Sequence, residues 1–296
     1  MNEIIIVDKP YGLTSSYVVN KLKKYFGASK AGHSGTLDPL ATGVLVIYFD
    51  DMTKIIPYID ESVKKYNVKI LLGLGTDTLD ISGKIINLSN IKNYTKTDLK
   101  EVVSSFEGEY NYRPPIFSAI KIKGTPSYKL ARKGRSVDLP IKNSYINKID
   151  IIEYGASTIN LEIESSKGTY VRALARDIGL SLGSHATVSK LRRTKTGKFD
   201  ISESNDFYSI LAGCDPIFFS IKKLFTVVEV EKKDITKIAN QKNFKNVNLS
   251  EFMSNNNKNS IIVISCQGAP ILIATNKFGT NGVYISSEIK FFNKKN

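Results

Sequence analysis

Residues 32–43 read GHSGTLDPLATG and form the most distinctive stretch of the sequence. Glycines, a proline and small hydroxylated residues at this density predict a tightly turned loop whose backbone can approach a ligand closely. The loop carries one imidazole, His33, and one carboxylate, Asp38. On composition alone, a plain glycine-rich turn in which Asp38 precedes Pro39 is the simpler interpretation.

The segments around this loop predict strands and helices that interleave without a regular βαβ rhythm. Upstream, apolar residues 4–7 predict a strand, and Ser15 or Ser16 is expected to cap a helix that ends at Gly27. Downstream, the continuous apolar run 44–49 predicts a buried strand. Further strands are expected over residues 63–74, 116–122 and 160–164, and helices over residues 97–106, 127–134 and 170–183. This order favours an α+β fold, a mixed and mostly antiparallel sheet with flanking helices.

The composition of the 296-residue chain is that of a folded globular protein. Two cysteines and two histidines exclude a disulfide framework and a Cys- or His-rich metal centre. No apolar run approaches the ~18 residues of a membrane span. The first ten residues lack the basic region and cleavage site of a signal peptide. We therefore expect a cytoplasmic protein that binds neither metal nor membrane.

Positive charge makes a polyanion the expected partner. The chain holds 42 Lys and Arg against 28 Asp and Glu, a net charge of +14. Residues 113–135 hold seven basic residues and no acidic one, and residues 166–198 hold eight with only Asp177 opposing them. The bulk charge alone also fits a Lys- and Asn-rich composition without any role in RNA binding. Clustering into two blocks favours contact with nucleic-acid phosphates.

The glycine-rich loop, extended to Leu45, resembles the signature of the TruB-type tRNA pseudouridine synthases. The family pattern GHTGTLDPLATGVL differs from this sequence only at Ser34. Other motifs of the family follow in the same order across residues 3–199. They are KPxGxTS at residues 9–15, a KxY-type segment ending at Tyr66, TDTxDxxG at 76–83, PPxxSAxK at 114–121, YxLARxG at 128–134, SKGTYxR at 166–172 and LRRTxxGxF at 191–199.

The resemblance implies three catalytic residues. Asp38 corresponds to the family's catalytic carboxylate, which is ionised at neutral pH because an ordinary Asp has a pKa of about 3.9. Arg172 corresponds to the arginine that pairs with this carboxylate and aims it. Tyr66 corresponds to the tyrosine that stacks on the target uracil and assists proton transfer. Without the motifs, Tyr66 would be an ordinary core residue and Arg172 a surface cation.

The resemblance also implies residues that bind the substrate. Tyr170 and Leu191 correspond to residues that line the base pocket, and His33 to a histidine that fills the space left by the departing base. Without the motifs, these three residues would be assigned to packing or to a turn. The expected contacts with the RNA backbone are Lys9, Arg132, Lys167, Arg192 and Arg193.

The family's reaction implies neither a cofactor nor a metal ion. Pseudouridine formation breaks the N1–C1′ bond of uridine, rotates the uracil and rejoins it through C5. The target base must leave its stack and enter a pocket. We expect this reaction at uridine 55 in the TΨC loop of tRNA, carried out by a monomer without a guide RNA. Two alternatives are a guide-RNA-dependent relative, for which the C-terminal part looks too short, and a non-catalytic RNA chaperone.

The composition changes after Phe225, which suggests a second domain. Residues 226–296 contain no arginine. Short strands are expected at residues 226–230, 261–265, 270–274 and 283–286. We therefore predict a pseudouridine-synthase domain over residues 1–225 and a small β-rich domain over residues 226–296. The resemblance implies that the second domain is a shortened, divergent PUA-like RNA-binding domain.

Overall fold

The computed structural model of the chain describes residues 1–122, 124–134, 138–231, 261–267, 269–279 and 282–291. The strands of its largest sheet are β1 (Ile4–Lys9), β2 (Ala31–Ser34), β3 (Thr42–Phe49), β4 (Val63–Leu72), β7 (Gly108–Tyr112), β10 (Lys142–Tyr154), β11 (Thr158–Ser166), β12 (Ala186–Thr196), β13 (Phe199–Asp200) and β14 (Asn205–Asp206). The helices are α1 (Ser15–Tyr25), α2 (Lys96–Ser104), α3 (Ser127–Ala131), α4 (Val171–Ser181) and α5 (Phe207–Leu211), with 3-10 turns at Asp50–Lys54, Ile56–Tyr58, Ile201–Glu203 and Ile221–Lys223. Two small hairpins pair β5 (Leu74–Thr76) with β6 (Ile85–Leu88) and β8 (Lys121–Ile122) with β9 (Thr125–Pro126).

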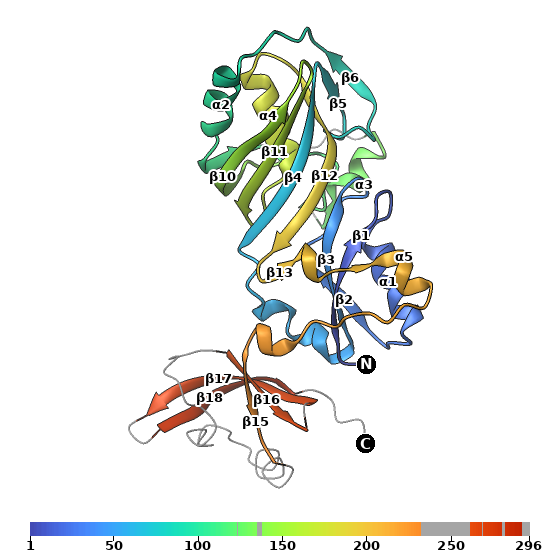
Figure 1. The fold of residues 1–296 in the computed structure, drawn as a ribbon, viewed down its shortest axis with the longest axis vertical. Helices are drawn as coiled ribbons and strands as arrows, with labels where there is room; N and C mark the ends of the chain where they lie inside the picture. The colour runs from blue at the N-terminus through green and yellow to red at the C-terminus, as the bar shows by residue number, and fades with distance from the viewer. Residues whose placement is uncertain (123, 135–137, 232–260, 268, 280–281, 292–296) are drawn as a thin grey trace.

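The largest sheet runs through the whole first part of the chain (Figure 1). Its strand order is β14-β1-β3-β12-β4-β11-β10-β7, with β2 paired to β3 and β13 paired to β12. Strands β1 and β14 are parallel, as are β3 and β12, and the other neighbours are antiparallel. The predicted α+β fold with a mixed, mostly antiparallel sheet is confirmed.

Around β4, one face of this sheet carries the core and the helices. In β4 the side chains of Tyr66, Val68 and Ile70 are buried, whereas Asn67 between them is exposed, as the alternation of a strand requires. The buried side chains of β4, α1 and α4 belong to one continuous hydrophobic cluster. Tyr66 therefore points toward the helices, and the odd-numbered residues of β4 point to the open face.

Two local expectations are wrong. Helix α1 is capped by Thr14, whose hydroxyl accepts from the backbone N–H of Tyr17 at 3.1 Å, and not by Ser15 or Ser16. The strand expected over residues 116–122 is limited to β8, because bends occupy residues 116–119. In that bend the hydroxyls of Ser118 and Ser127 are hydrogen-bonded, 3.0 Å apart. A side-chain contact therefore fixes the turn that alternation alone did not reveal.

A second sheet begins at residue 226. It contains β15 (Thr226–Glu229), β16 (Ile261–Cys266), β17 (Ala269–Gly279) and β18 (Gly282–Phe291), in that order. Val263 and Ile273 pack with Ile4 and Phe219 in a second hydrophobic cluster, so this sheet shares a core with the first part of the chain. The division at residue 225 and the PUA-like character of the second part stay predictions. No helix among the described residues is long and apolar enough to span a bilayer.

Gly43 joins the two halves of the large sheet. Its φ angle is +101°, and a Cβ at this position would lie 2.1 Å from the backbone oxygen of Arg193. Gly43 is also one of only two β3 residues registered against β12. Only glycine allows the two strands to approach this closely beside the loop that carries Asp38.

Replacing Gly43 with alanine is expected to lower the free energy of unfolding by about 3 kcal/mol or more, because strand separation adds to backbone strain. Gly213 is the matched control, since its φ angle is +97° and a Cβ placed there would have no neighbour within 4 Å. Gly213→Ala should cost only the left-handed strain of about 1–2 kcal/mol. Urea unfolding measures both losses, and equal losses would show that the close approach is not the cause.

Candidate active site

The loop between β2 and β3 is held in place by the first residue of α1 and by the segment before it. The Ser15 hydroxyl accepts from the backbone N–H of Leu37 and donates to its carbonyl, both at 2.9 Å. The backbone N–H of Gly12 donates to the carbonyl of Pro39 at 2.8 Å. Two separate sequence motifs thus form one rigid support around Asp38.

Asp38 and Arg172 form an ion pair at the start of helix α4. Arg172 Nε lies 2.8 Å from Asp38 Oδ2, although the N–H direction is not that of a hydrogen bond. The Arg172 side chain is 4% exposed and that of Asp38 is 36% exposed. A buried cation therefore aims a carboxylate that stays accessible to a ligand.

Asp80 is a second acidic partner of Arg172 that the sequence interpretation missed. Its carboxylate lies 3.5 Å from Arg172 and is nearly buried. Arg172 also donates to the carbonyl oxygens of Thr78 at 2.6 Å and Phe117 at 3.0 Å. Two carboxylates and two carbonyl oxygens therefore fix the guanidinium. The sequence did contain a signal for Asp80, since it is the second aspartate of the TDTxDxxG motif.

A cavity of about 250 Å³ lies beside this ion pair. Asp38, Arg172, Tyr66, Tyr170 and Leu191 all line it, so the structure brings together five of the six predicted catalytic and base-binding residues. Burial raises the pKa of both tyrosines above the ordinary value, and their hydroxyls stay protonated at neutral pH. The cavity thus offers an accessible carboxylate between aromatic and aliphatic walls.

His33, the sixth of these residues, does not line the cavity. It lies on β2, half-buried, and its Nδ1 atom is buried without a hydrogen-bond partner within the part of the chain that is described. Burial and the nearby Arg193 lower its pKa, so the imidazole is neutral at neutral pH. Its role toward a departing base stays a prediction.

Two of the predicted RNA contacts are corrected by burial. Lys9 is fully buried and donates to the carbonyl oxygens of Pro10 and Leu13 at 2.8 and 2.6 Å. Arg193 is 1% exposed and donates to the carbonyl oxygens of Val44 and Gly35. Both cations hold the loop against the sheet, so neither lies on the outer surface, where these contacts were expected.

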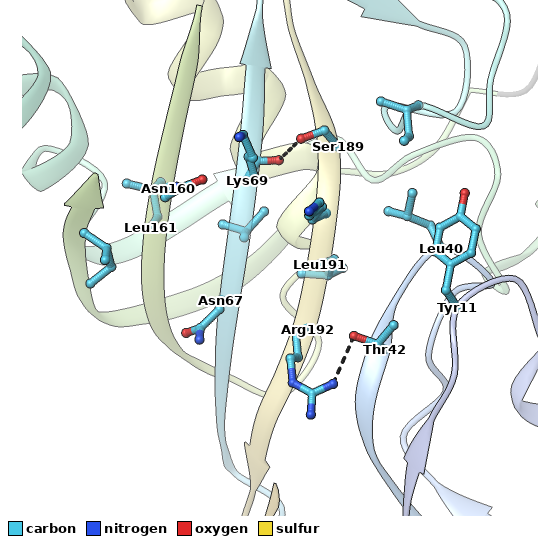
Figure 2. Close-up of a pocket in the computed structure, with 14 residues that line it drawn as sticks. Tyr11, Leu40, Thr42, Asn67, Lys69, Asn160, Leu161, Ser189, Leu191 and Arg192 are labelled. Atoms are coloured by element: carbon cyan, nitrogen blue, oxygen red, sulfur yellow. Dashed lines mark hydrogen bonds between the residues drawn. The ribbon is translucent and has the colours of Figure 1, made fainter. Parts of the chain in front are cut away.

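Arg132 and Lys167 are exposed and stay predicted RNA contacts. Arg192 lies on the open face of the sheet, in a larger hollow of about 700 Å³ that Asn67 and Tyr11 also line (Figure 2). It forms a two-point ion pair with Asp8 at 2.6 and 3.0 Å. Its role in RNA binding stays a prediction, on a surface away from the Asp38 carboxylate.

Comparison with known proteins decides which family carries this arrangement. Residues 23–171 match the N-terminal domain of the TruB family pseudouridylate synthases, and residues 172–212 match the C-terminal domain of tRNA pseudouridylate synthase B. The chain belongs to the TruB family. It is therefore a pseudouridylate synthase, an isomerase of RNA modification.

Relatives in the TruB family align over most of the chain. The tRNA pseudouridine synthase B of Francisella philomiragia subsp. philomiragia is 38% identical over 249 residues, which cover 80% of this chain and 82% of that protein. The tRNA pseudouridine synthase B of Wigglesworthia glossinidia brevipalpis is 42% identical over 213 residues, 71% of this chain and 65% of that protein.

Solved structures confirm the fold of the family. An H/ACA RNP bound to a substrate RNA containing 2′-deoxyuridine has a chain with a TM-score of 0.66 and 19% identity, over 99% of this chain and 86% of that one. A Cbf5-Nop10-Gar1 complex gives a TM-score of 0.65 and 20% identity, over 99% and 87% of the chains. At this identity the likeness concerns the fold alone.

Proposed function

We propose that this TruB-family protein converts uridine 55 in the TΨC loop of tRNA to pseudouridine, as a stand-alone enzyme of the cytoplasm. The observation that carries the proposal is the cavity in which Asp38, Arg172 and Tyr66 meet. The tRNA substrate is supported by relatives at 38% and 42% identity that are named tRNA pseudouridine synthase B.

The reaction requires the target uridine to be flipped into the cavity, with Tyr66 stacking on its base. There the carboxylate of Asp38 acts on the reacting nucleotide while the N1–C1′ bond breaks. The uracil rotates, C5 joins C1′, C5 loses its proton and N1 gains one, so atoms and charge balance. Arg172 keeps the carboxylate aimed throughout.

A guide-RNA-dependent enzyme is the competing function. It is suggested by the H/ACA complexes, whose chains share this fold at 19–20% identity. The tRNA-enzyme relatives are about twice as similar in sequence, which favours the tRNA substrate. In the proposed function the protein needs no guide RNA or partner protein, and a single copy of the chain contains every proposed catalytic residue.

Tritium release tests the proposal directly. A TΨC stem-loop labelled with 5-³H-uridine at the target position loses its label to water when C5 joins C1′. We expect release by the purified protein alone, and none from a stem-loop with cytidine at that position. A folded protein that binds the stem-loop without release contradicts the proposed function and favours a non-catalytic chaperone. Release only after addition of a guide RNA favours the competing enzyme.

Replacing Tyr66 with phenylalanine is expected to slow turnover on the order of 10²-fold with little change in RNA affinity, because the ring remains and the proton-transfer hydroxyl is lost. Since burial raises the Tyr66 pKa, the hydroxyl keeps its proton as pH rises through 9. Between pH 7 and 9, the single-turnover rate of the wild type should therefore show no decline that is absent from the Tyr66→Phe variant. Such a decline would contradict the protonated state of the Tyr66 hydroxyl. A Tyr66→Phe rate equal to that of the wild type would contradict the proton-transfer role.

A further inference from the structure

Lys64 is a buried cation at the edge of the cavity. The proposed function gives this residue no role. It lies two residues before Tyr66 on β4, so both side chains point to the same face of the sheet. Its side chain is 11% exposed and lines the same cavity as Asp38. Lys65 points to the opposite face, where it pairs with Glu164 at 2.9 Å.

The charge around Lys64 is incompletely neutralised within the described part of the chain. The acidic group that faces it there is Glu61, with Nζ and Oε2 3.9 Å apart, which is too long for a hydrogen bond. Burial lowers the Lys64 pKa, and the positive charges of Arg193 and Lys167 lower it further. Arg193 donates to the carbonyl oxygens of Val44 and Gly35, which are neutral and leave its charge intact. This end of the cavity is therefore electropositive.

Gly35 keeps the space beside the Lys64 ammonium open. Its φ angle is +70°, and a Cβ at this position would lie 2.8 Å from Lys64 Nζ, 3.2 Å from the guanidinium of Arg193 and 3.6 Å from Glu61 Oε2, so two cations and one carboxylate surround this point. Any larger residue would place carbon where a ligand oxygen can approach both cations. The glycine therefore leaves the electropositive end of the cavity accessible.

We propose that Lys64 binds a phosphate that flanks the flipped uridine. Two residues along a strand span about 6.6 Å. This separation is comparable to that between a nucleotide's base and its own phosphate. With the uracil against Tyr66, the sugar-phosphate backbone reaches Lys64, and a charge-assisted hydrogen bond neutralises the buried ammonium. This subsite rests on the proposed function, because it requires an RNA strand that enters the cavity.

The test compares stem-loops that carry a neutral methylphosphonate at either linkage flanking the target uridine. Affinity is measured by fluorescence anisotropy in the Asp38→Asn background, which prevents conversion of the RNA. We expect one methylphosphonate to weaken binding about 10-fold when Lys64 is present. Lys64→Met should weaken binding of unmodified RNA by a similar factor and abolish the further loss from that methylphosphonate.

Lys65→Met is the matched control, because it removes the neighbouring charge from the other face of β4. It should keep the full sensitivity to the methylphosphonate. Lys64→Arg should also keep the sensitivity to the methylphosphonate. This variant serves as a test if Lys64→Met fails to fold. Equal sensitivity of the proteins with and without the Lys64→Met substitution would overturn the phosphate site, as would an Asp38→Asn protein that ignores both methylphosphonates. Failure of the proposed function would appear separately, as absence of tritium release by the wild type.

Discussion

Replacing Asp38 with asparagine is expected to slow pseudouridine formation on the order of 10⁴-fold or more, with RNA binding nearly unchanged. The amide keeps the size and place of the carboxylate but carries no charge and is a poor nucleophile. Asp38 is 36% exposed in its cavity and lies 2.8 Å from Arg172, so the loop around it needs no rearrangement. The substitution therefore removes chemistry and leaves the shape of the site.

Single-turnover tritium release at saturating stem-loop measures this rate, and anisotropy measures binding. Asp8→Asn is the matched control, because Asp8 has similar exposure, 30%, and is also paired with an arginine, Arg192. That pair lies on the open face of the sheet, so its loss should leave the rate near that of the wild type. Substantial turnover by folded Asp38→Asn protein would remove Asp38 from the mechanism.

The elements that the sequence predicted well are those with strong apolar periodicity. Strands β1 and β3 contain the continuous apolar runs 4–7 and 44–49 and are almost fully buried, and helix α1 buries one regular face. Strand β12 was not predicted. Its register shifts twice against β4, and the basic residues on its open face gave the sequence the pattern of a charged segment. Strand β10 contains similar irregularities against β11.

The sequence predicted those site residues that belong to recognisable local motifs. Asp38 and Arg172 lie 2.8 Å apart although 134 positions separate them in the sequence, and the family resemblance alone joined them. Charge in a sequence does not reveal burial, which is why Lys9 was expected on the surface. The position of Asp80 against Arg172 depends on the loop between β5 and β6 folding back toward β12, with Asp80 bridged to Val188. Such contacts are set by tertiary packing.

Replacing Arg172 with methionine should damage both catalysis and stability. The rate is expected to fall on the order of 10³-fold, because Arg172 is the cation that forms an ion pair with Asp38 and aims it in the described part of the chain. The free energy of unfolding is expected to fall by about 3–5 kcal/mol, because Asp80 would be left buried without its cation. Urea unfolding and single-turnover tritium release measure the two losses separately.

A second substitution distinguishes the two effects. In Arg172→Met/Asp80→Asn the stranded charge is gone, so part of the lost stability should return while the rate stays low. Arg176→Met on the same helix is the control. Arg176 pairs with Asp177 near the surface, and loss of that pair should cost no more than about 1 kcal/mol and leave the rate unchanged. A near-wild-type rate in folded Arg172→Met protein would show that the pairing does not serve catalysis. A double variant no more stable than the single one would show that the buried carboxylate of Asp80 is not what destabilises it.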